Sequence, residues 1–203
     1  MLTSLPVAFV GVACSLTTDL DGFSLPDGGR PAPPATDAVA DVADSADLVD
    51  SADGADSSGP PIYVSDLPFV VVANGYGPVE RDTSNGEAAA GDGRTLTLDG
   101  VTYAKGLGVH AESEVTVPLG GLYKRFLSDV GADDEVGANA TIVFQVSADG
   151  VALFDSGVMT GAAPTMHVDV DVTGKTELRL VVTGAGDGIS LDHADWANAR
   201  LLR

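Results

Sequence analysis

From Ile62 to its end, the sequence predicts an all-β fold in which antiparallel strands form a β-sandwich. Short runs rich in Val, Leu, Phe, Tyr and Thr are separated by glycine and aspartate turns, a pattern typical of strands joined by tight connections. Several runs alternate apolar and polar residues, and no stretch has the spacing of a long amphipathic helix. The segments with this pattern are 101–111, 114–119, 125–132, 141–157, 166–172 and 177–185.

Two of these segments predict finer detail. Asp149-Gly150 lies between two apolar runs, which is a strong signal for a tight turn, so residues 141–155 are expected to form a hairpin. His167, Asp169 and Asp171 alternate with valines, so one face of that strand should meet water while the other packs inward. The residues expected to fill the core are Trp196, Phe126, Phe144, Phe154, Val143 and Leu180.

Residues 1–14 are similar to a bacterial leader that ends in a lipobox. Cys14 is the only cysteine of the chain, and it follows a short apolar segment in which Gly11 and Ala13 are small. Two features depart from such signals: no Lys or Arg precedes Arg30, and Gly11 stands where leucine is usual. Lipidation of Cys14 and an idle thiol both remain open. An extracytoplasmic protein is expected: a lipoprotein of the cell surface or outer membrane if Cys14 is lipidated, or otherwise a secreted protein.

Residues 15–61 have the composition of a linker, rich in Asp, Ala, Pro and Gly. Aspartate recurs at every third position from Asp41 to Asp56. A helix would stack these like charges, and calcium loops require glycine turns and mixed oxygen ligands at fixed positions. A self-repelling, extended spacer is therefore the favoured interpretation, ahead of a helical face or a calcium-binding repeat.

Charge excludes two classes of partner. The chain has a formal net charge of −20, and residues 1–60 contribute ten aspartates against one arginine. Such a charge repels phosphate backbones and anionic lipid surfaces, so nucleic acid is not expected as a partner, and a membrane is expected only through a lipid anchor. Neutral glycans and cations suit it better, although solubility alone also explains the acidity.

Five segments carry a resemblance to a known family. They are NGYGPVERDTSNGE (74–87), GLGVHAESEVTVPLGGLYKRF (106–126), VGADDEVG (130–137), VFQVSADGVALFDSG (143–157) and DHADWANARL (192–201). In this order they resemble the NPCBM/CBM51 carbohydrate-binding modules, over roughly residues 62–203. The resemblance implies a jelly-roll-like sandwich of the galactose-binding-domain-like kind. It also implies binding of neutral glycans that end in galactose-type sugars, by a monomer.

No catalytic signature accompanies this resemblance. The sequence lacks GxSxG and HExxH, and its three histidines do not have a spacing typical of zinc ligands. The sequence therefore predicts a module that is not an enzyme. Two other hypotheses stay open: a surface adhesin or protein-interaction domain that has lost the sugar site, and a hydrolase accessory domain. Phe69 and Tyr76, where relatives often carry tryptophan, motivate the first of these.

The candidate ligand-binding residues are polar or aromatic groups of the turns. Sugars are held when an aromatic face stacks on their C–H groups while carboxylates, amides and histidine bind their hydroxyls. Tyr76 lies between two glycines, a context that exposes its ring, although a ring that merely closes a turn explains it equally well. His110 ends a strand, where a core histidine with satisfied hydrogen bonds is the default interpretation and a ligand-binding residue is the alternative. The full set is Tyr76, Glu80, Asp82, His110, Glu112, Asp134 and His193.

Crowded carboxylates suggest a structural calcium ion. Asp133, Asp134 and Glu135 share one loop. A second acidic group, Asp187, Asp192 and Asp195, lies near the carboxyl terminus. If Ile62-Tyr63-Val64 pairs with the last strand, Asp66 would lie near Asp195 and could share the ion. A solvated acidic loop is the alternative for each cluster. The candidate calcium ligands are Asp66, Asp133, Asp192 and Asp195.

Overall fold

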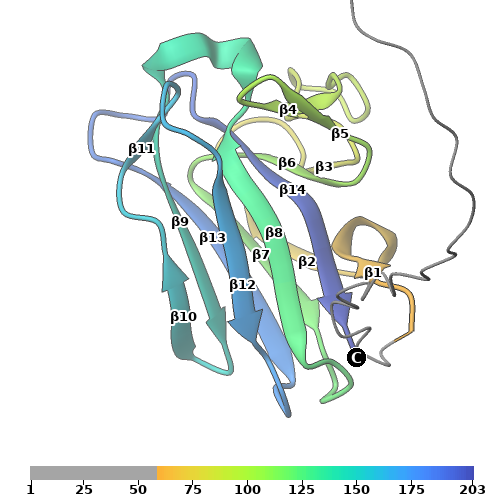
Figure 1. The fold of residues 1–203 in the computed structure, drawn as a ribbon. Coiled ribbons are helices and arrows are strands. Elements are labelled where there is room, and N and C mark those ends of the chain that lie inside the picture. Colours follow the sequence, from red (N-terminus) through yellow and green to blue (C-terminus); the bar gives the residue numbers. More distant parts are fainter. Residues whose placement is uncertain (1–58) are drawn as a thin grey trace, which may run out of the picture. The chain divides into compact units, whose positions relative to one another are not determined.

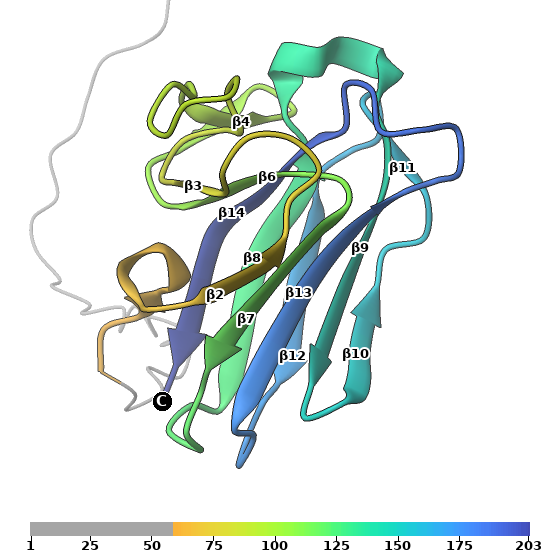
Figure 2. The ribbon, with the colours of Figure 1, turned by 180° about the vertical axis from the view of Figure 1, so that it is seen from behind.

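A computed structural model describes residues 59–203, and these form two stacked antiparallel sheets (Figures 1 and 2). The predicted β-sandwich is therefore confirmed. Cys14 and the linker up to residue 58 lie outside the described residues. In this part of the chain the only helical turns are the 3-10 turns η1 (Val64–Asp66) and η2 (Asp134–Asn139). None of the described helices is long and apolar enough to cross a membrane.

The first sheet has the strand order β12-β8-β14-β6-β3, with β1 paired to β14. Because β14 lies in the middle, it contacts both β8 and β6 along its length. The predicted pairing of the first strand with the last is also confirmed, with Ile62 opposite Leu201. The strands are β1 (Ile62–Tyr63), β3 (Glu80–Arg81), β6 (Gly106–His110), β8 (Arg125–Ala132), β12 (Met166–Asp171) and β14 (His193–Leu202).

The second sheet has the order β10-β9-β13-β7-β2, with β11 paired to β9. The predicted hairpin is β9–β10, and its turn residues Asp149 and Gly150 both have positive φ (47° and 76°), as a type I′ turn requires. The strands are β2 (Val70–Ala73), β7 (Ser113–Pro118), β9 (Thr141–Ala148), β10 (Val151–Asp155), β11 (Met159–Thr160) and β13 (Glu177–Gly184).

The core lies between the sheets around Trp196, which is fully buried. Phe144 meets its ring edge-on with centroids 4.9 Å apart, and Phe126 packs on it at 6.4 Å. The predicted core is thus confirmed for Trp196, Phe126, Phe144 and Leu180, while Phe154 is partly buried against the core. Val143 was wrongly predicted as a core residue: side chains alternate along β9, so it lies on the opposite face from Ile142 and Phe144.

A third, smaller layer covers part of the outer face of the first sheet. It is the hairpin of β4 (Leu96–Leu98) and β5 (Val101–Tyr103), with Leu96 and Leu98 buried beneath it. Residues 101–111 were expected to be one strand, but the chain leaves this hairpin and enters the sheet as β6 at Gly106. A Cβ at Gly106 would lie 2.6 Å from the carbonyl oxygen of Trp196, so only glycine allows that entry.

Strand β9 provides a test of the alternation of inward and outward side chains. Phe144→Ala should lower the free energy of unfolding by about 3–5 kcal/mol, because it leaves a cavity against Trp196. Val143→Ala, one position along the strand, should cost less than about 1 kcal/mol because it empties no core volume. Urea unfolding of the two variants measures both values. Equal losses would show that the inner face of β9 has been assigned to the wrong residues.

Candidate functional site

One end of the sandwich, uppermost in Figures 1 and 2, gathers the loops that carry most of the candidate residues. The antiparallel pairing of β6 with β14 places His110 directly opposite His193 at this end. The loop after β2 contacts this pair, because Gly75 donates to the carbonyl oxygen of His110 and Asn74 accepts from its N–H. The turn between β6 and β7 adjoins it too, since Ala111 donates to the carbonyl oxygen of Asp192. We call the group formed by exposed Tyr76 and Glu112, half-buried His193 and buried His110 (5% exposed) the rim site.

Three rings form a row in the rim site. The centroids of Tyr76 and His110 are 5.9 Å apart, those of His110 and His193 are 5.1 Å apart, and both pairs meet at about 60°. Tyr76 is the outermost of the three, with 44% of its surface exposed. Tyr76 is therefore the ring of this row that is most open to solvent.

Two asparagines that the sequence analysis missed hold the Tyr76 loop in place. The amide of Asn74 donates to the carbonyl oxygens of Tyr76 (2.8 Å) and Gly77 (3.1 Å), and its Oδ1 accepts from the backbone N–H of His110 (2.9 Å). The amide of Asn85 donates to the carbonyl oxygens of Tyr76 and Pro78. Asn74, which precedes the Gly-Tyr-Gly turn, was the only residue whose position in the sequence indicated this role, since asparagine side chains commonly bond local backbone.

His110 presents a defined hydrogen-bonding atom. Its Nδ1 lies 2.7 Å from the carbonyl oxygen of Ala111, which can only accept, so Nδ1 carries the proton. Burial lowers the pKa of His110 below its ordinary value, and the neighbouring His193 acts in the same direction although the bond to Ala111 opposes it. The ring is therefore neutral at pH 7, and Nε2 can accept a hydrogen bond from a hydroxyl.

His193 is fixed by an acidic partner from a different element. Its Nδ1 lies 2.8 Å from Oε1 of Glu135 in η2, and both side chains are largely buried. This contact joins the start of β14 to the 3-10 turn, which forms one wall at this end of the sandwich. The sequence placed Glu135 in a candidate calcium loop and gave no signal that it would bind a histidine.

The carboxylates of Glu112 and Asp192 lie close to His110. Exposed Glu112 accepts a hydrogen bond from the backbone N–H of Gly184 through Oε1 (3.0 Å), which leaves Oε2 free for a ligand. Asp192 is only 2% exposed and accepts from the N–H of Thr141 (3.0 Å). Burial raises the pKa of Asp192, and the charges of Asp187 and Glu112 add to the effect.

Three other candidate ligand residues have structural partners instead. Glu80 is buried and accepts from the backbone N–H of Gly91 (2.8 Å). Asp82 accepts from Lys105 (2.8 Å) and from the N–H of Gly106 (3.1 Å). Asp134 accepts from the N–H groups of the β4–β5 turn. The structure thus brings Tyr76, His110, Glu112 and His193 together, while these three carboxylates secure loops.

The four candidate calcium ligands do not form one cluster. Asp66 pairs with Lys105 (2.5 Å), and Asp192 belongs to the rim. Asp133 and Asp195 are neighbours. They lie beneath the β4–β5 hairpin, because Asp133 accepts from the N–H of Thr97 in β4 (3.1 Å). Within residues 59–203 no group of three or more His, Cys, Asp or Glu side chains is arranged to hold a metal ion.

Asp195 is the most unusual carboxyl group of the domain. It is fully buried between Gly108 of β6 and Gly131 of β8, and neither of its oxygens has a hydrogen-bond partner of good geometry. Burial raises the pKa of Asp195 well above its ordinary value, and the nearby Asp133 and Glu135 carboxylates raise it further. Burial therefore favours the uncharged form of the Asp195 carboxyl in the folded domain.

A match to a protein family decides the identity of this domain. A model of the NPCBM/NEW2 domain matches residues 61–202, which is most of the chain. The chain belongs to this family. The resemblance seen in the sequence is therefore confirmed, and the rim site is a feature of an NPCBM domain.

Solved structures agree with this NPCBM assignment. The CBM51 module of Clostridium perfringens GH95, solved in complex with methyl-galactose, is 40% identical and superposes with a TM-score of 0.64; the match covers 70% of this chain and 99% of that one. A second structure contains CBM51-2 in complex with GlcNAc, together with INT domains, from Clostridium perfringens ZmpB. It is 31% identical with a TM-score of 0.65, and the match covers 72% of this chain and 32% of that one.

Curated relatives are much longer proteins than this NPCBM chain. A putative endo-alpha-N-acetylgalactosaminidase of Renibacterium salmoninarum is 41% identical over 143 residues, which is 69% of this chain and 9% of the relative. Alpha-1,3-galactosidase B of Akkermansia muciniphila is 33% identical over 107 residues, covering 51% of this chain and 13% of the relative. The chain thus spans about a tenth of the length of the relatives it matches.

The raised pKa of Asp195 predicts a pH dependence of stability, measured with a chelator present. Its folded-state pKa lies above the unfolded value of about 3.9, so the free energy of unfolding falls as pH rises from that value through the folded-state pKa. Asn mimics the protonated carboxyl and cannot ionise. Asp195→Asn should therefore gain stability relative to the unsubstituted protein between pH 4 and pH 8, measured by urea unfolding. A relative loss over this range would contradict the assignment.

Proposed function

We propose that this NPCBM domain is a non-catalytic carbohydrate-binding module that holds the end of a neutral, galactose-type glycan at the rim site. The observation that carries the proposal is the row of Tyr76, His110 and His193, because it combines an exposed ring with a neutral histidine acceptor. The methyl-galactose complex of a 40% identical module supports the choice of sugar.

Each rim side chain has a role that its geometry suggests. The exposed face of Tyr76 stacks on the C–H face of the sugar ring. Nε2 of His110 accepts a hydrogen bond from one hydroxyl, and the free oxygen of Glu112 accepts from another. His193, held by Glu135, supports the ring of His110 from behind. The carboxylates make an anionic sugar a poor ligand at this position.

The carboxylates of the rim also favour binding over hydrolysis. A glycosidase needs two carboxyl groups that both reach the bond to be cleaved. Glu112 is exposed, but Asp192 is almost completely buried, and one of its oxygens already accepts from Thr141. One accessible carboxylate can bind a hydroxyl but cannot supply both an acid and a base. Hydrolysis would then require groups that the rim site does not supply.

We propose Asp133 and Asp195 as the position of a structural calcium ion in this module. The fit rests on the buried oxygens of Asp195, which have no partner, and on the hard oxygen chemistry that calcium prefers. The two carboxylates supply at most four oxygens, so backbone carbonyls or water would complete the shell. The ion would take the place of the proton on Asp195 and remove the cost of its burial.

Display outside the cytoplasm is also part of the proposal. The NPCBM relatives named as glycosidases act on glycans, which supports an extracellular setting. Attachment by a lipid at Cys14, followed by the linker of residues 15–61, would hold the domain away from the membrane surface. Mass spectrometry of the mature amino terminus tests the lipid directly.

A protein-binding role without sugar is the second candidate, and one observation favours it. Val70, Val71 and Val72 are 60%, 45% and 58% exposed on β2, the edge strand of the second sheet. Such an apolar edge can bind another chain. The position of Phe69 no longer supports this candidate, since Phe69 packs beneath Arg81 (3.9 Å) rather than lying in the rim site.

Sugar binding is tested by substitution of the exposed ring. Tyr76→Ala should weaken binding of methyl-galactose by about tenfold, since it removes the stacking surface. Leu122→Ala is a matched control, because Leu122 is exposed (63%) in the loop after β7, away from the rim. Isothermal titration calorimetry of both variants gives the comparison. No binding of methyl-galactose by the unsubstituted domain, or equal binding by Tyr76→Ala, would count against the proposal.

Calcium binding is tested by thermal unfolding. One millimolar calcium should raise the Tm of the unsubstituted domain above its value in chelator, and Asp195→Asn should abolish the rise because it removes the carboxylate that would bind the ion. Asp66→Asn should keep the rise, since Asp66 pairs with Lys105. A Tm that is the same with calcium and with chelator would remove calcium from the account.

A further inference from the structure

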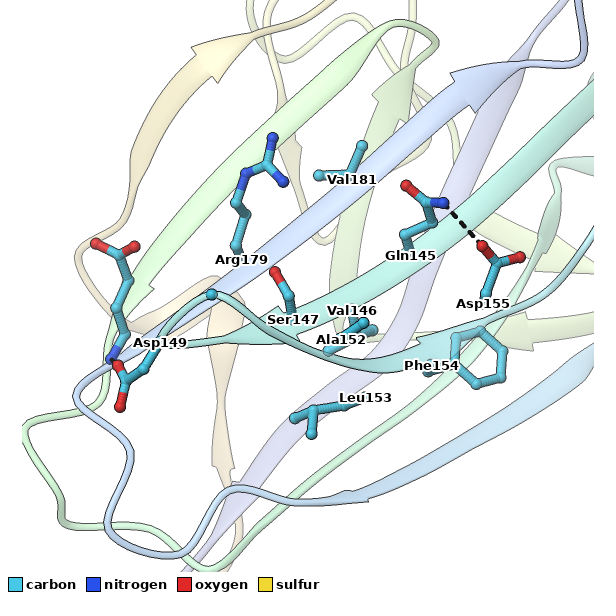
Figure 3. A pocket seen from close by; sticks show the side chains of 12 residues that line it. Gln145, Val146, Ser147, Asp149, Ala152, Leu153, Phe154, Asp155, Arg179 and Val181 are labelled. Atoms are coloured by element: carbon cyan, nitrogen blue, oxygen red, sulfur yellow. Dashed lines mark hydrogen bonds between the residues drawn. The ribbon is translucent and has the colours of Figure 1, made fainter.

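The outer face of the second sheet contains a hollow of about 630 Å³ that is separate from the rim site. Strands β9, β10 and β13 form it, and Figure 3 shows the side chains that line it. This volume lies within the range of about 300–1,000 Å³ that is usual for ligand sites. We call it the sheet hollow.

Small side chains at matched positions create the sheet hollow. In the antiparallel register Ala152 of β10 lies opposite Ser147 of β9, and Ser147 lies opposite Arg179 of β13. One row along, Asp155, Gln145 and Val181 lie side by side in the same way. Ser147, Ala152 and Val181 therefore leave space between longer side chains at the margins.

The longer side chains supply hydrogen-bonding groups that are held in place. Nε2 of Gln145 donates to Asp155 (2.8 Å), which leaves the amide oxygen of Gln145 free. Arg179 donates to both oxygens of Glu114 (2.7 and 2.6 Å) through Nε and Nη2, so its Nη1 remains available as a donor. One free donor, Nη1 of Arg179, and one free acceptor, the amide oxygen of Gln145, thus lie beside the methyl groups of Ala152 and Val181.

The charges of the sheet hollow select an uncharged ligand. Asp149, Asp155 and Glu177 line it, while the charge of Arg179 is neutralised by Glu114. Anionic ligands are therefore repelled. A peptide adds to the edge of a sheet through its backbone, whereas the hollow lies on the face of β9 and β13, beside the edge strand β10 rather than along its edge. A polyhydroxylated ring fits both the apolar methyl groups and the polar margin of the hollow.

We propose that the sheet hollow is a second glycan-binding site, which takes units of a neutral oligosaccharide chain. It goes beyond the proposed rim site because it requires none of the rim residues. Thr141, at the start of β9, contacts Asp192 at the rim, and Ser147 lies six residues farther along the strand. At about 3.3 Å per residue the two sites are roughly 20 Å apart, so one monosaccharide cannot occupy both. A glycan surface that engages both sites would be bound with avidity.

NMR titration of the ¹⁵N-labelled Tyr76→Ala domain tests this second site in isolation. The probes are galactotetraose, cellotetraose and lacto-N-tetraose, each a neutral tetrasaccharide. At least one should cause saturable shifts of the backbone amides of Gln145, Ser147 and Ala152. Gln145→Ala, added to Tyr76→Ala, should weaken that binding about fivefold, the effect of one lost hydrogen bond.

Two controls separate this proposal from that of the rim. Thr183→Ala changes the outer face of β13 outside the hollow and should leave tetrasaccharide binding unchanged. Methyl-galactose added to the domain with Tyr76 intact reports the rim site through the amides of Tyr76 and His110. If all three tetrasaccharides leave the amides of the hollow unmoved, the second site is overturned, whatever the rim does. Hollow shifts without rim shifts would support the second site and contradict the first.

Discussion

The register between β6 and β14 is the constraint on which the rest of the site depends. This register pairs His110 with His193, and it also pairs Gly108 with the buried Asp195. A shift of one residue would turn Trp196 out of the core and Asp195 into it, because successive side chains point to opposite faces. The same alternation that buries Trp196 between the sheets therefore sends Asp195 to the outer face, beneath the third layer.

Glycines make this burial possible. A Cβ at Gly108 would lie 2.4 Å from the backbone of Ser84 and Asn85, so the segment that carries Asn85 can cross the sheet only over a residue without a side chain. Asn85 in turn bonds the Tyr76 loop from below. The packing around Asp195 and the position of the exposed ring are thus two results of one close approach between layers.

The sequence was sufficient for the fold and for part of the rim site. Alternation and the Asp149-Gly150 turn predicted the strands, because these signals are local. Val143 was misassigned because an apolar residue alone does not say which face of a strand is the inner one. Tyr76 and His110 were found as candidates, but the bond of Glu135 to His193 joins residues 58 positions apart, and no local pattern encodes it. Asp66 failed to meet Asp195 because β1 pairs near the far end of β14, with Leu201.

A crystal structure of the domain with methyl-galactose tests the central claim most directly. The account predicts electron density for the sugar ring against the exposed face of Tyr76, with one hydroxyl within hydrogen-bond distance of Nε2 of His110. A sugar bound elsewhere on the sandwich, with Tyr76 and His110 untouched, would contradict it.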